Sequence, residues 1–445
     1  MESRNRHLVV LVAAVMAAFA IAPAEAAAPQ QATVRVSVST NGIQSTGGDA
    51  EKAAISANGE FVAFTSPATN LVPSDANGKK DVFLRELRSG VTTRVSVNSV
   101  GAEANGDSAN PSISADGRFV AFDSTATDLV SGDSNGLQDV FIHDRQTGQT
   151  TRVSVDSTGA EAVGGNSIEP SISADGRVVA FLSNATNLVS NDNNAKTDVF
   201  VHDRATGQTT RANLGPANVE ANNFSSSPAI SADGHVVAFV SDADNLVSGG
   251  DLNGVKDVFV HDLVAGKTKR VSTGPEGVEG NGDSRFPSLS ANGSAVAFQS
   301  FATNLVPGDT NAVEDVFVTR GARPVRVSMG VSGVQGNNGS VDARISDDGL
   351  SVVFVSAASN LVPNDTNGAI DVFVVRGTNP ARMNLGPGAA EADLASSGPT
   401  ITANGRIVAY RSDATTLIDD DTNADTDVFV SQLRTTRNGF QLFPN

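Results

Sequence analysis

Short apolar runs recur along the chain, and each run follows a polar turn. In one copy, the apolar run Phe119–Phe122 follows the turn Ala115–Arg118, and a second run, Asp139–His143, comes after a long polar loop. Nearly continuous apolar runs of this length predict strands that are covered on both faces. The segment Thr151–Val155 alternates between polar and apolar residues, which predicts an outer strand, and Pro111–Ser114 predicts a short strand before the turn.

The same four-strand unit occurs seven times, at a spacing of about 58 residues. The sequence Asp-Val-Phe begins the third strand of each copy and marks its position. It starts at Asp81, Asp139, Asp198, Asp257, Asp315, Asp371 and Asp427. Four antiparallel strands per repeat are typical of a propeller blade, because stacked blades bury the apolar faces of their neighbours. The sequence therefore predicts an all-β fold, a seven-bladed β-propeller of four-stranded antiparallel blades in one domain over residues 33–445.

One further segment predicts how the ring closes. Thr33–Val38 matches the outer strands of the other copies but precedes the first complete repeat. We therefore expect this N-terminal strand to complete the seventh blade, which removes an open sheet edge. The segment Thr435–Phe440 is the alternative for the same place.

The first 26 residues have a different pattern. Arg4 and Arg6 precede the apolar run Leu8–Ala22, and Ala24-Glu25-Ala26 then fits the small-x-small cleavage rule. This order of basic, apolar and small residues predicts a signal peptide over residues 1–26, with a retained membrane anchor as the alternative. We expect an exported protein, periplasmic or extracellular, with no membrane span after cleavage.

Composition and charge narrow the choice of partners. The formal net charge is −18, there is no cysteine or tryptophan, and there is one tyrosine. Strong acidity argues against nucleic acid and anionic lipid surfaces, and the lack of cysteine excludes thiol chemistry. The expected partner is another envelope or extracellular protein, and the oligomeric state is left open.

The run Pro111–Phe122 resembles the WD-like repeat of TolB-type propellers, and the similarity extends to all seven copies. This resemblance implies the propeller fold, export and protein–protein contact in the envelope. Two features depart from that family. Ala or Asp replaces the proline before the turn, and the long acidic loop is not part of the family's repeat.

The long loop of every copy carries the pattern Asp-x-Asn-x-x-x-Asp, and the residues between these positions vary. Alternate Asp and Asn oxygens in a tight loop are typical calcium ligands, so calcium is the predicted cofactor. Asp and Asn also close turns by bonding to their own backbone, and this alternative stays open. The candidate metal residues are Asp75, Asn77, Asp81, Asp133, Asn135, Asp139, Asp192, Asn194, Asp198, Asp251, Asn253, Asp257, Asp309, Asn311, Asp315, Asp365, Asn367, Asp371, Asp421, Asn423 and Asp427.

The function that these patterns favour is a non-catalytic binding scaffold. An enzyme would need unlike residues from different blades to converge on the axis, whereas the residues that draw attention here are alike in every copy. No catalytic residue is predicted. The alternative is a propeller hydrolase or lactonase with a metal-dependent site on the face that carries the long loops.

Overall fold

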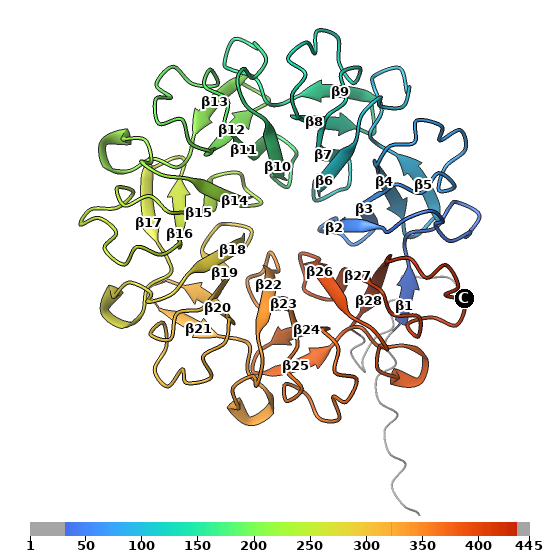
Figure 1. Cartoon of the computed structure of the whole chain (residues 1–445), viewed down its shortest axis with the longest axis vertical. Coiled ribbons are helices and arrows are strands. Elements are labelled where there is room, and N and C mark those ends of the chain that lie inside the picture. Colours follow the sequence, from blue (N-terminus) through green and yellow to red (C-terminus); the bar gives the residue numbers. More distant parts are fainter. Residues whose placement is uncertain (1–31, 322, 434–445) are drawn as a thin grey trace, which may run out of the picture.

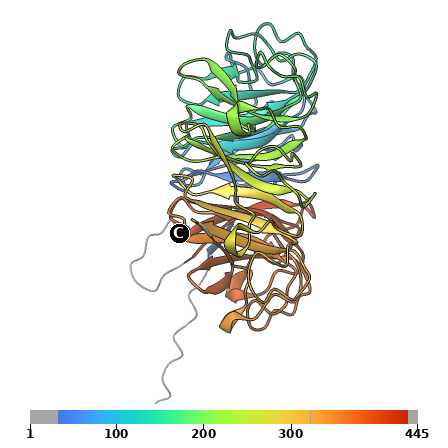
Figure 2. The ribbon, with the colours of Figure 1, turned by 90° about the vertical axis from the view of Figure 1, so that its left-hand side faces the viewer.

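The computed structural model describes residues 32–321 and 323–433. Seven four-stranded antiparallel sheets stand around a central axis, so the predicted seven-bladed propeller is confirmed (Figure 1). Seen from the side, the blades form a single flat layer (Figure 2). The predicted signal peptide and the segment 435–440 lie outside the described residues.

The blades follow one another in chain order. Blade 1 consists of β2 (Glu51–Ile55), β3 (Phe61–Ser66), β4 (Asp81–Glu86) and β5 (Val91–Arg94). Blade 2 consists of β6 (Ser108–Ile113), β7 (Phe119–Ser124), β8 (Asp139–Asp144) and β9 (Gln149–Arg152). Blade 3 consists of β10 (Ser167–Ile172), β11 (Val178–Ser183), β12 (Asp198–Asp203) and β13 (Gln208–Arg211). Blade 4 consists of β14 (Ser225–Ile230), β15 (Val236–Ser241), β16 (Asp257–Asp262) and β17 (Lys267–Arg270).

The remaining blades repeat this order, except at the closure. Blade 5 consists of β18 (Ser284–Leu289), β19 (Ala295–Ser300), β20 (Asp315–Arg320) and β21 (Pro324–Arg326). Blade 6 consists of β22 (Ser340–Ile345), β23 (Ser351–Ser356), β24 (Asp371–Arg376) and β25 (Asn379–Arg382). Blade 7 consists of β26 (Ser396–Ile401), β27 (Ile407–Ser412), β28 (Asp427–Gln432) and β1 (Ala32–Arg35).

Over residues 32–321 and 323–433, helical structure is confined to short turns in the loops that join blades. These are the 3-10 turns η1 (Pro216–Asn218), η2 (Pro275–Gly277), η3 (Val331–Gly333) and η4 (Pro387–Ala389). In the part of the chain that the structure describes, no helix is long and apolar enough to cross a membrane.

The N-terminal strand closes the ring, as predicted. Strand β1 pairs antiparallel with β28, from Ala32 opposite Gln432 to Arg35 opposite Phe429. It forms the outermost strand of blade 7, beside the last strand of the described chain (Figure 1). The closure therefore joins the first and last strands by backbone hydrogen bonds.

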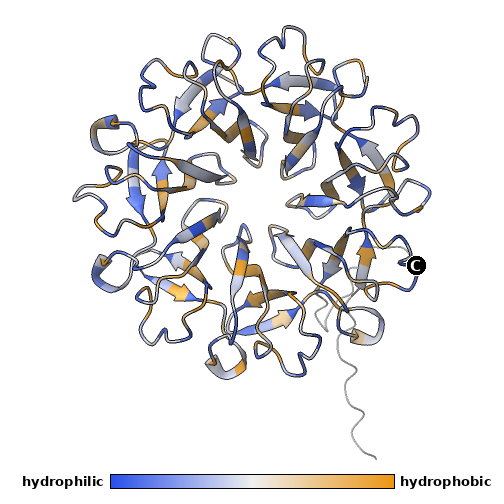
Figure 3. Cartoon of the chain, viewed as in Figure 1, coloured by the Kyte–Doolittle hydropathy of each residue, from blue (hydrophilic) through white to orange (hydrophobic). Residues whose placement is uncertain are grey.

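The Val-Ala-Phe sequence in the second strand of blades 1–5 explains how these blades pack. In blade 2, Phe122 stacks on Phe141 with ring centroids 6.0 Å apart, and both pack against Ala63 of blade 1. Ala121 points the other way and contacts Phe181 of blade 3. A large residue thus meets a small one at this interface, whereas between blades 6 and 7 Val353 takes the place of the alanine and packs against Tyr410. Figure 3 shows apolar residues concentrated in the middle strands of the blades.

Two local details differ from the sequence prediction. Strand β9 ends at Arg152 instead of Val155, because the Ser154 side chain turns inward and donates a hydrogen bond to Asp139 at 2.5 Å. The turn predicted at Ala115–Arg118 also includes Ser114, because β6 ends at Ile113 and β7 begins at Phe119. The Asp116 carboxylate closes it by accepting from Ser114 Oγ at 2.8 Å and from the Arg118 amide at 2.9 Å. Only the glycine of the turn, Gly117, has a positive φ (75°).

Candidate functional site

The structure brings the two aspartates of each long loop together around an arginine. In blade 2, Arg152 NH1 lies 3.2 Å from Asp133 Oδ1, 3.2 Å from Asp139 Oδ2 and 3.0 Å from Glu161 Oε2. Both aspartate side chains are buried, and the arginine is only 10% exposed. The guanidinium therefore supplies positive charge at the place where the sequence suggested a calcium ion.

The asparagine of the long loop connects this loop to the loop that joins two blades. Asn135 Nδ2 donates to Asp139 at 2.9 Å and to the Ala162 carbonyl at 3.1 Å, and Asn135 Oδ1 accepts from the Leu137 amide at 2.8 Å. Ala162 lies in the loop that leads to blade 3. The asparagine thus fixes the long loop to the blade-joining loop, which is the turn-closing role that the sequence left open.

All seven blades repeat this cluster, and in each one the arginine is the last residue of the outer strand. Glutamate is the third acceptor in five clusters, and Gln335 and Gln44 replace it in blades 5 and 7. The arginines are Arg94, Arg152, Arg211, Arg270, Arg326, Arg382 and, from β1, Arg35. Sequence analysis missed them, although they recur as regularly as the aspartates.

The contacts do not select calcium. Among the described residues, no group of three or more His, Asp or Glu side chains is arranged to hold a metal ion. The Asp133 carboxylate nevertheless accepts no hydrogen bond, which leaves lone pairs for water or a cation. Calcium in these loops therefore stays a prediction.

Burial changes the acidity of the aspartates that begin the third strands. It raises the pKa of Asp257 to about 7, because the loss of hydration outweighs the stabilising effect of Ser272 and Arg270 on the charged form. Burial also raises the pKa of Asp198, Asp371 and Asp427. These carboxyl groups hold protons at higher pH in the folded protein than in the unfolded chain.

We therefore expect Asp257 to contribute more stability as the pH falls from 7.5 to 5.5. Burial lowers the pKa of His143, His202 and His261, so these side chains act in the opposite direction over the same range. The stabilisation from Asp257 is complete below its unfolded pKa near 3.8 and is lost as the pH rises toward about 7. The slope for one group is at most about 1.4 kcal/mol per pH unit. Thermal unfolding of the unmodified chain and of Asp257→Asn at both pH values isolates this contribution, because the histidines are the same in both proteins. The gain in stability on acidification should be smaller in Asp257→Asn, and an identical pH dependence in the two proteins would contradict the assignment.

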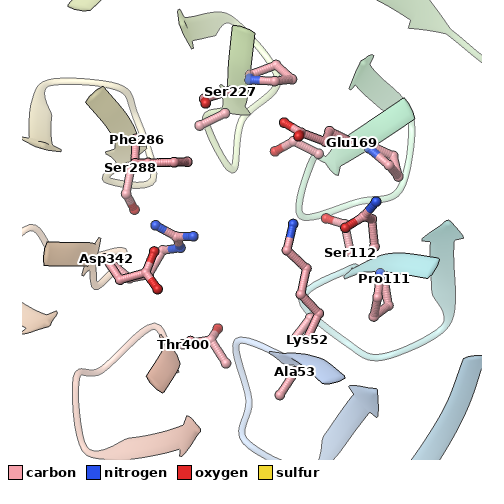
Figure 4. Close-up of a pocket in the computed structure, with 18 of the residues that line it drawn as sticks. Lys52, Ala53, Pro111, Ser112, Glu169, Ser227, Phe286, Ser288, Asp342 and Thr400 are labelled. Carbon is pink, nitrogen blue, oxygen red and sulfur yellow. The ribbon is translucent and has the colours of Figure 1, made fainter. Parts of the chain in front are cut away.

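A second cluster lies on the axis of the ring, where unlike residues converge. The innermost strand of every blade has an irregular register near its start, and one residue there projects into a cavity of about 380 Å³ (Figure 4). The seven residues, in blade order, are Lys52, Asn110, Glu169, Ser227, Phe286, Asp342 and Gly398. Each strand runs from the long-loop face to the short-turn face, so these residues lie nearer the long loops.

The backbone at this position is strained. The φ angle is positive at all seven residues, for example 53° at Glu169, 50° at Phe286 and 59° at Asp342. Only the residue in blade 7, Gly398, is a glycine, and other residues in this conformation each cost about 1 kcal/mol or more. Bulges of this kind redirect side chains and are frequent beside active sites.

We call this cavity the axial channel. At its two acidic residues, Glu169 and Asp342, the backbone is fixed by a side chain of the preceding blade. The Glu169 amide donates to Asp123 Oδ2 at 2.9 Å, and the Asp342 amide donates to Gln299 Oε1 at 2.7 Å. Asp123 and Gln299 occupy the same position in the second strands of the preceding blades. Behind Ser227, Phe286 and Gly398 this position holds Leu182, Val240 and Val355. Side-chain acceptors therefore support the two carboxylate-bearing bulges.

Positive charge gathers on one side of the channel. Lys52 of blade 1, Arg344 of blade 6 and Arg411 of blade 7 all line the cavity, and these blades are consecutive. Within the described residues, none of the three forms an ion pair. Figure 4 shows the Lys52 side chain reaching toward the centre, with Glu169 and Asp342 on opposite sides. The cavity thus combines carboxylates, cations, a serine and a phenylalanine.

Sequence analysis missed this site because it searched for recurrence. The channel residue directly precedes a recurrent proline in five blades, as at Glu169-Pro170 and Phe286-Pro287. Proline suits this strand because the strand is a sheet edge and needs no amide donor. A variable residue before a proline that recurs in five blades was the available signal.

Comparisons with known proteins show the fold. No family model matches the chain, and no curated protein sequence matches it either. An oligogalacturonate lyase of Vibrio parahaemolyticus is 13% identical, with a TM-score of 0.53, over 91% of this chain and 94% of the lyase. An oligogalacturonate lyase in complex with manganese is 14% identical, with a TM-score of 0.51, over 92% and 98%.

An acylaminoacyl peptidase of Pyrococcus horikoshii is 12% identical, with a TM-score of 0.50, over 82% of this chain and 49% of the peptidase. This chain therefore corresponds to about half the length of that enzyme. A TolB-type protein of Agrobacterium tumefaciens is also similar, but with a TM-score of only 0.40. The propeller fold that the resemblance to TolB-type repeats implied is confirmed by the seven four-stranded sheets of the structure, and no family model places the chain in that family.

These findings correct the predicted function. The similar structures are mostly enzymes, lyases and peptidases, which overturns the prediction of a non-catalytic scaffold. The argument behind that prediction was also wrong, because unlike residues from different blades do converge on the axis. At these identities the comparisons establish the fold, and the activity is argued next from the channel.

Proposed function

We propose that the chain is an enzyme of the lyase or hydrolase class, and that the axial channel is its active site. The observation that carries this proposal is the strained bulge that brings a different side chain into the cavity from each of six blades. A structural role alone would favour glycine at all seven positions, as in blade 7. Strain that persists where side chains meet in a cavity is typical of functional sites.

Glu169 and Asp342 are the residues that we assign to proton transfer. Cleavage of a C–O bond by elimination needs a base to remove a proton and an acid to protonate the leaving oxygen, and hydrolysis needs the same pair with water as the nucleophile. Two carboxylates on opposite sides of one cavity can divide these roles. Their bulges are fixed by Asp123 and Gln299, which holds the carboxylates in place before the substrate binds.

Of the two classes, we favour a lyase. The likeness to the oligogalacturonate lyases extends over nearly the whole of those enzymes, whereas it covers about half of the peptidase. Among the described residues, the lining of the channel includes Ser112, Ser171, Ser227 and Ser288 but no histidine, so it offers no Ser-His pair.

An activity assay with oligogalacturonate tests this proposal. Elimination creates a double bond conjugated to the carboxylate, which absorbs ultraviolet light, whereas hydrolysis creates a reducing end without that absorbance. We expect the ultraviolet signal from the purified protein. Reducing ends without absorbance would identify a hydrolase, and the absence of both products, also with neutral oligosaccharides and esters, would refute the enzyme proposal.

The calcium ion predicted from the sequence needs a separate test. Manganese in one of the similar lyases makes a divalent ion reasonable in such a propeller but does not favour calcium. The channel itself, with two carboxylates beside three cations, does not suit a divalent ion, so we assign no step to a metal. If the Asp/Asn loops bind calcium, a free calcium concentration of about 100 times the Kd raises the free energy of unfolding by about 2.7 kcal/mol. A chelator then removes this gain. Equal melting temperatures in calcium and in chelator would exclude calcium.

Export and a partner protein in the envelope stay predictions from the sequence. Cell fractionation, with N-terminal sequencing of the mature protein, tests the cleavage predicted after Ala26. An intact N-terminus in the cytoplasmic fraction would contradict it.

A further inference from the structure

We propose that the axial channel binds an acidic sugar, with its carboxylates on the wall formed by blades 6, 7 and 1 and its ring on the opposite wall. This inference names the ligand class of the active site proposed above and so rests on that site. It concerns binding, however, and can be tested without turnover.

The charge of the channel differs from that of the whole molecule. The chain has a formal net charge of −18, yet three cations and two carboxylates line this cavity. None of these three cations forms an ion pair with a residue that the structure describes. Arg344 NH1 donates to the Ala343 carbonyl at 2.9 Å, Arg411 Nε donates to Ser397 Oγ at 2.7 Å, and the described residues give Lys52 no hydrogen-bond partner. Each cation therefore retains free donors for an anion.

The arginines elsewhere in the fold provide the contrast. The last arginine of each outer strand is surrounded by two aspartates and a third acceptor, as at Arg152. The chain has enough acid to neutralise its structural arginines, but it leaves Arg344 and Arg411 without carboxylates. Planar guanidinium groups with free donors are suited to bidentate binding of carboxylates.

The opposite wall, formed by blades 2 to 5, has the carboxylate of Glu169 and also the one aromatic side chain among the seven bulge residues. Phe286 is 43% exposed although it lies inside the ring, and Ser227 and Asn110 occupy bulges on the same side. An aromatic face beside hydrogen-bonding side chains suits the C–H face and hydroxyl groups of a sugar ring. A ligand with carboxylates and sugar rings satisfies both walls, whereas a simple anion satisfies only the cationic wall.

Isothermal titration calorimetry with trigalacturonate tests the inference, in a Glu169→Gln background so that heat from turnover does not interfere. We expect saturable binding that weakens with added salt. Maltotriose, which is neutral, should bind at least tenfold more weakly, and citrate, which has carboxylates but no ring, should also bind more weakly. Equal affinity for either control would overturn the assignment of an acidic sugar.

Substitutions then locate the binding wall. Arg344→Gln and Arg411→Gln should each lower the affinity for trigalacturonate by about tenfold or more, since each removes a charge-assisted hydrogen bond. Arg406→Gln is the matched control, because Arg406 is exposed and has no ion pair. Circular dichroism melts confirm that the variants fold. Unchanged affinity in the Arg344→Gln/Arg411→Gln double variant would overturn the proposal.

The two proposals fail differently. Binding that depends on these arginines, without any turnover by the unmodified chain, supports the ligand site and refutes the enzyme. Turnover of a neutral substrate, with no binding of trigalacturonate, supports the enzyme and refutes the acidic ligand.

Discussion

Replacing Glu169 with glutamine is expected to lower kcat by about 10²–10⁴-fold, the usual contribution of a general acid or base. Glutamine keeps the size of the side chain and the backbone hydrogen bond from residue 169 to Asp123, but it cannot exchange a proton. Asp342→Asn should have an effect of similar size. If both carboxylates act in one step, kcat of the double variant will be only slightly lower than kcat of the less active single variant.

The control for this experiment is Glu276→Gln. Glu276 also has a positive φ, 61°, but it lies exposed in η2, in the loop that joins blades 4 and 5. It tests whether loss of a glutamate from a strained backbone position affects activity by itself. Activity that survives in both Glu169→Gln and Asp342→Asn would remove the assigned roles, whatever the control shows.

Replacing Arg35 with alanine is expected to lower the free energy of unfolding by about 3–5 kcal/mol, because it leaves buried carboxylates without a partner. Arg35 NH2 lies 3.1 Å from Asp421, and its Nε lies 3.3 Å from Asp427; all three side chains are at most 5% exposed. This arginine belongs to β1, so the loss also weakens the attachment of the closing strand. Denaturant unfolding followed by circular dichroism measures the change.

Two further variants separate the effect of unpaired buried charge on stability from the effect of a weakened ring closure. Arg152→Ala removes the equivalent arginine from blade 2, where the chain is continuous, so any additional loss in Arg35→Ala reports on the closure. Asp427→Asn, added to Arg35→Ala, should recover part of the stability because it removes one unpaired charge. A loss below 1 kcal/mol in Arg35→Ala would mean that water compensates these carboxylates.

The fold could be predicted because the kinds of residue that form the blade interfaces recur from repeat to repeat. Ala121 and Phe122 have counterparts in the other blades because every interface joins the same two surfaces, and the matching strand at Thr33 indicated the closure. The limits of β9 were missed because a tertiary contact, Ser154 with Asp139, ends that strand. Local sequence patterns do not contain such a contact.

The site could be predicted only in part, for the opposite reason. The active site that we propose lies where the blades differ from one another, at residues such as Glu169 and Phe286. The recurring Asp133 and Asp139 were visible in the sequence. Their partner Arg152 was not connected to them, because the arginine lies at the end of the following strand and pairing depends on the fold.

The closure by β1 has a consequence for biosynthesis. Thr33 and Ser431 share a hydrogen bond although they are 398 positions apart in the sequence. Strand β1 therefore leaves the ribosome first, and its partner β28 is made only after six blades are complete. Contacts between such distant segments form late in folding. Until β28 is available, blades 1 and 7 cannot bury the apolar surface between them. A nascent chain that stalls earlier therefore keeps an open ring with exposed apolar faces, which quality-control proteases can distinguish from the finished molecule.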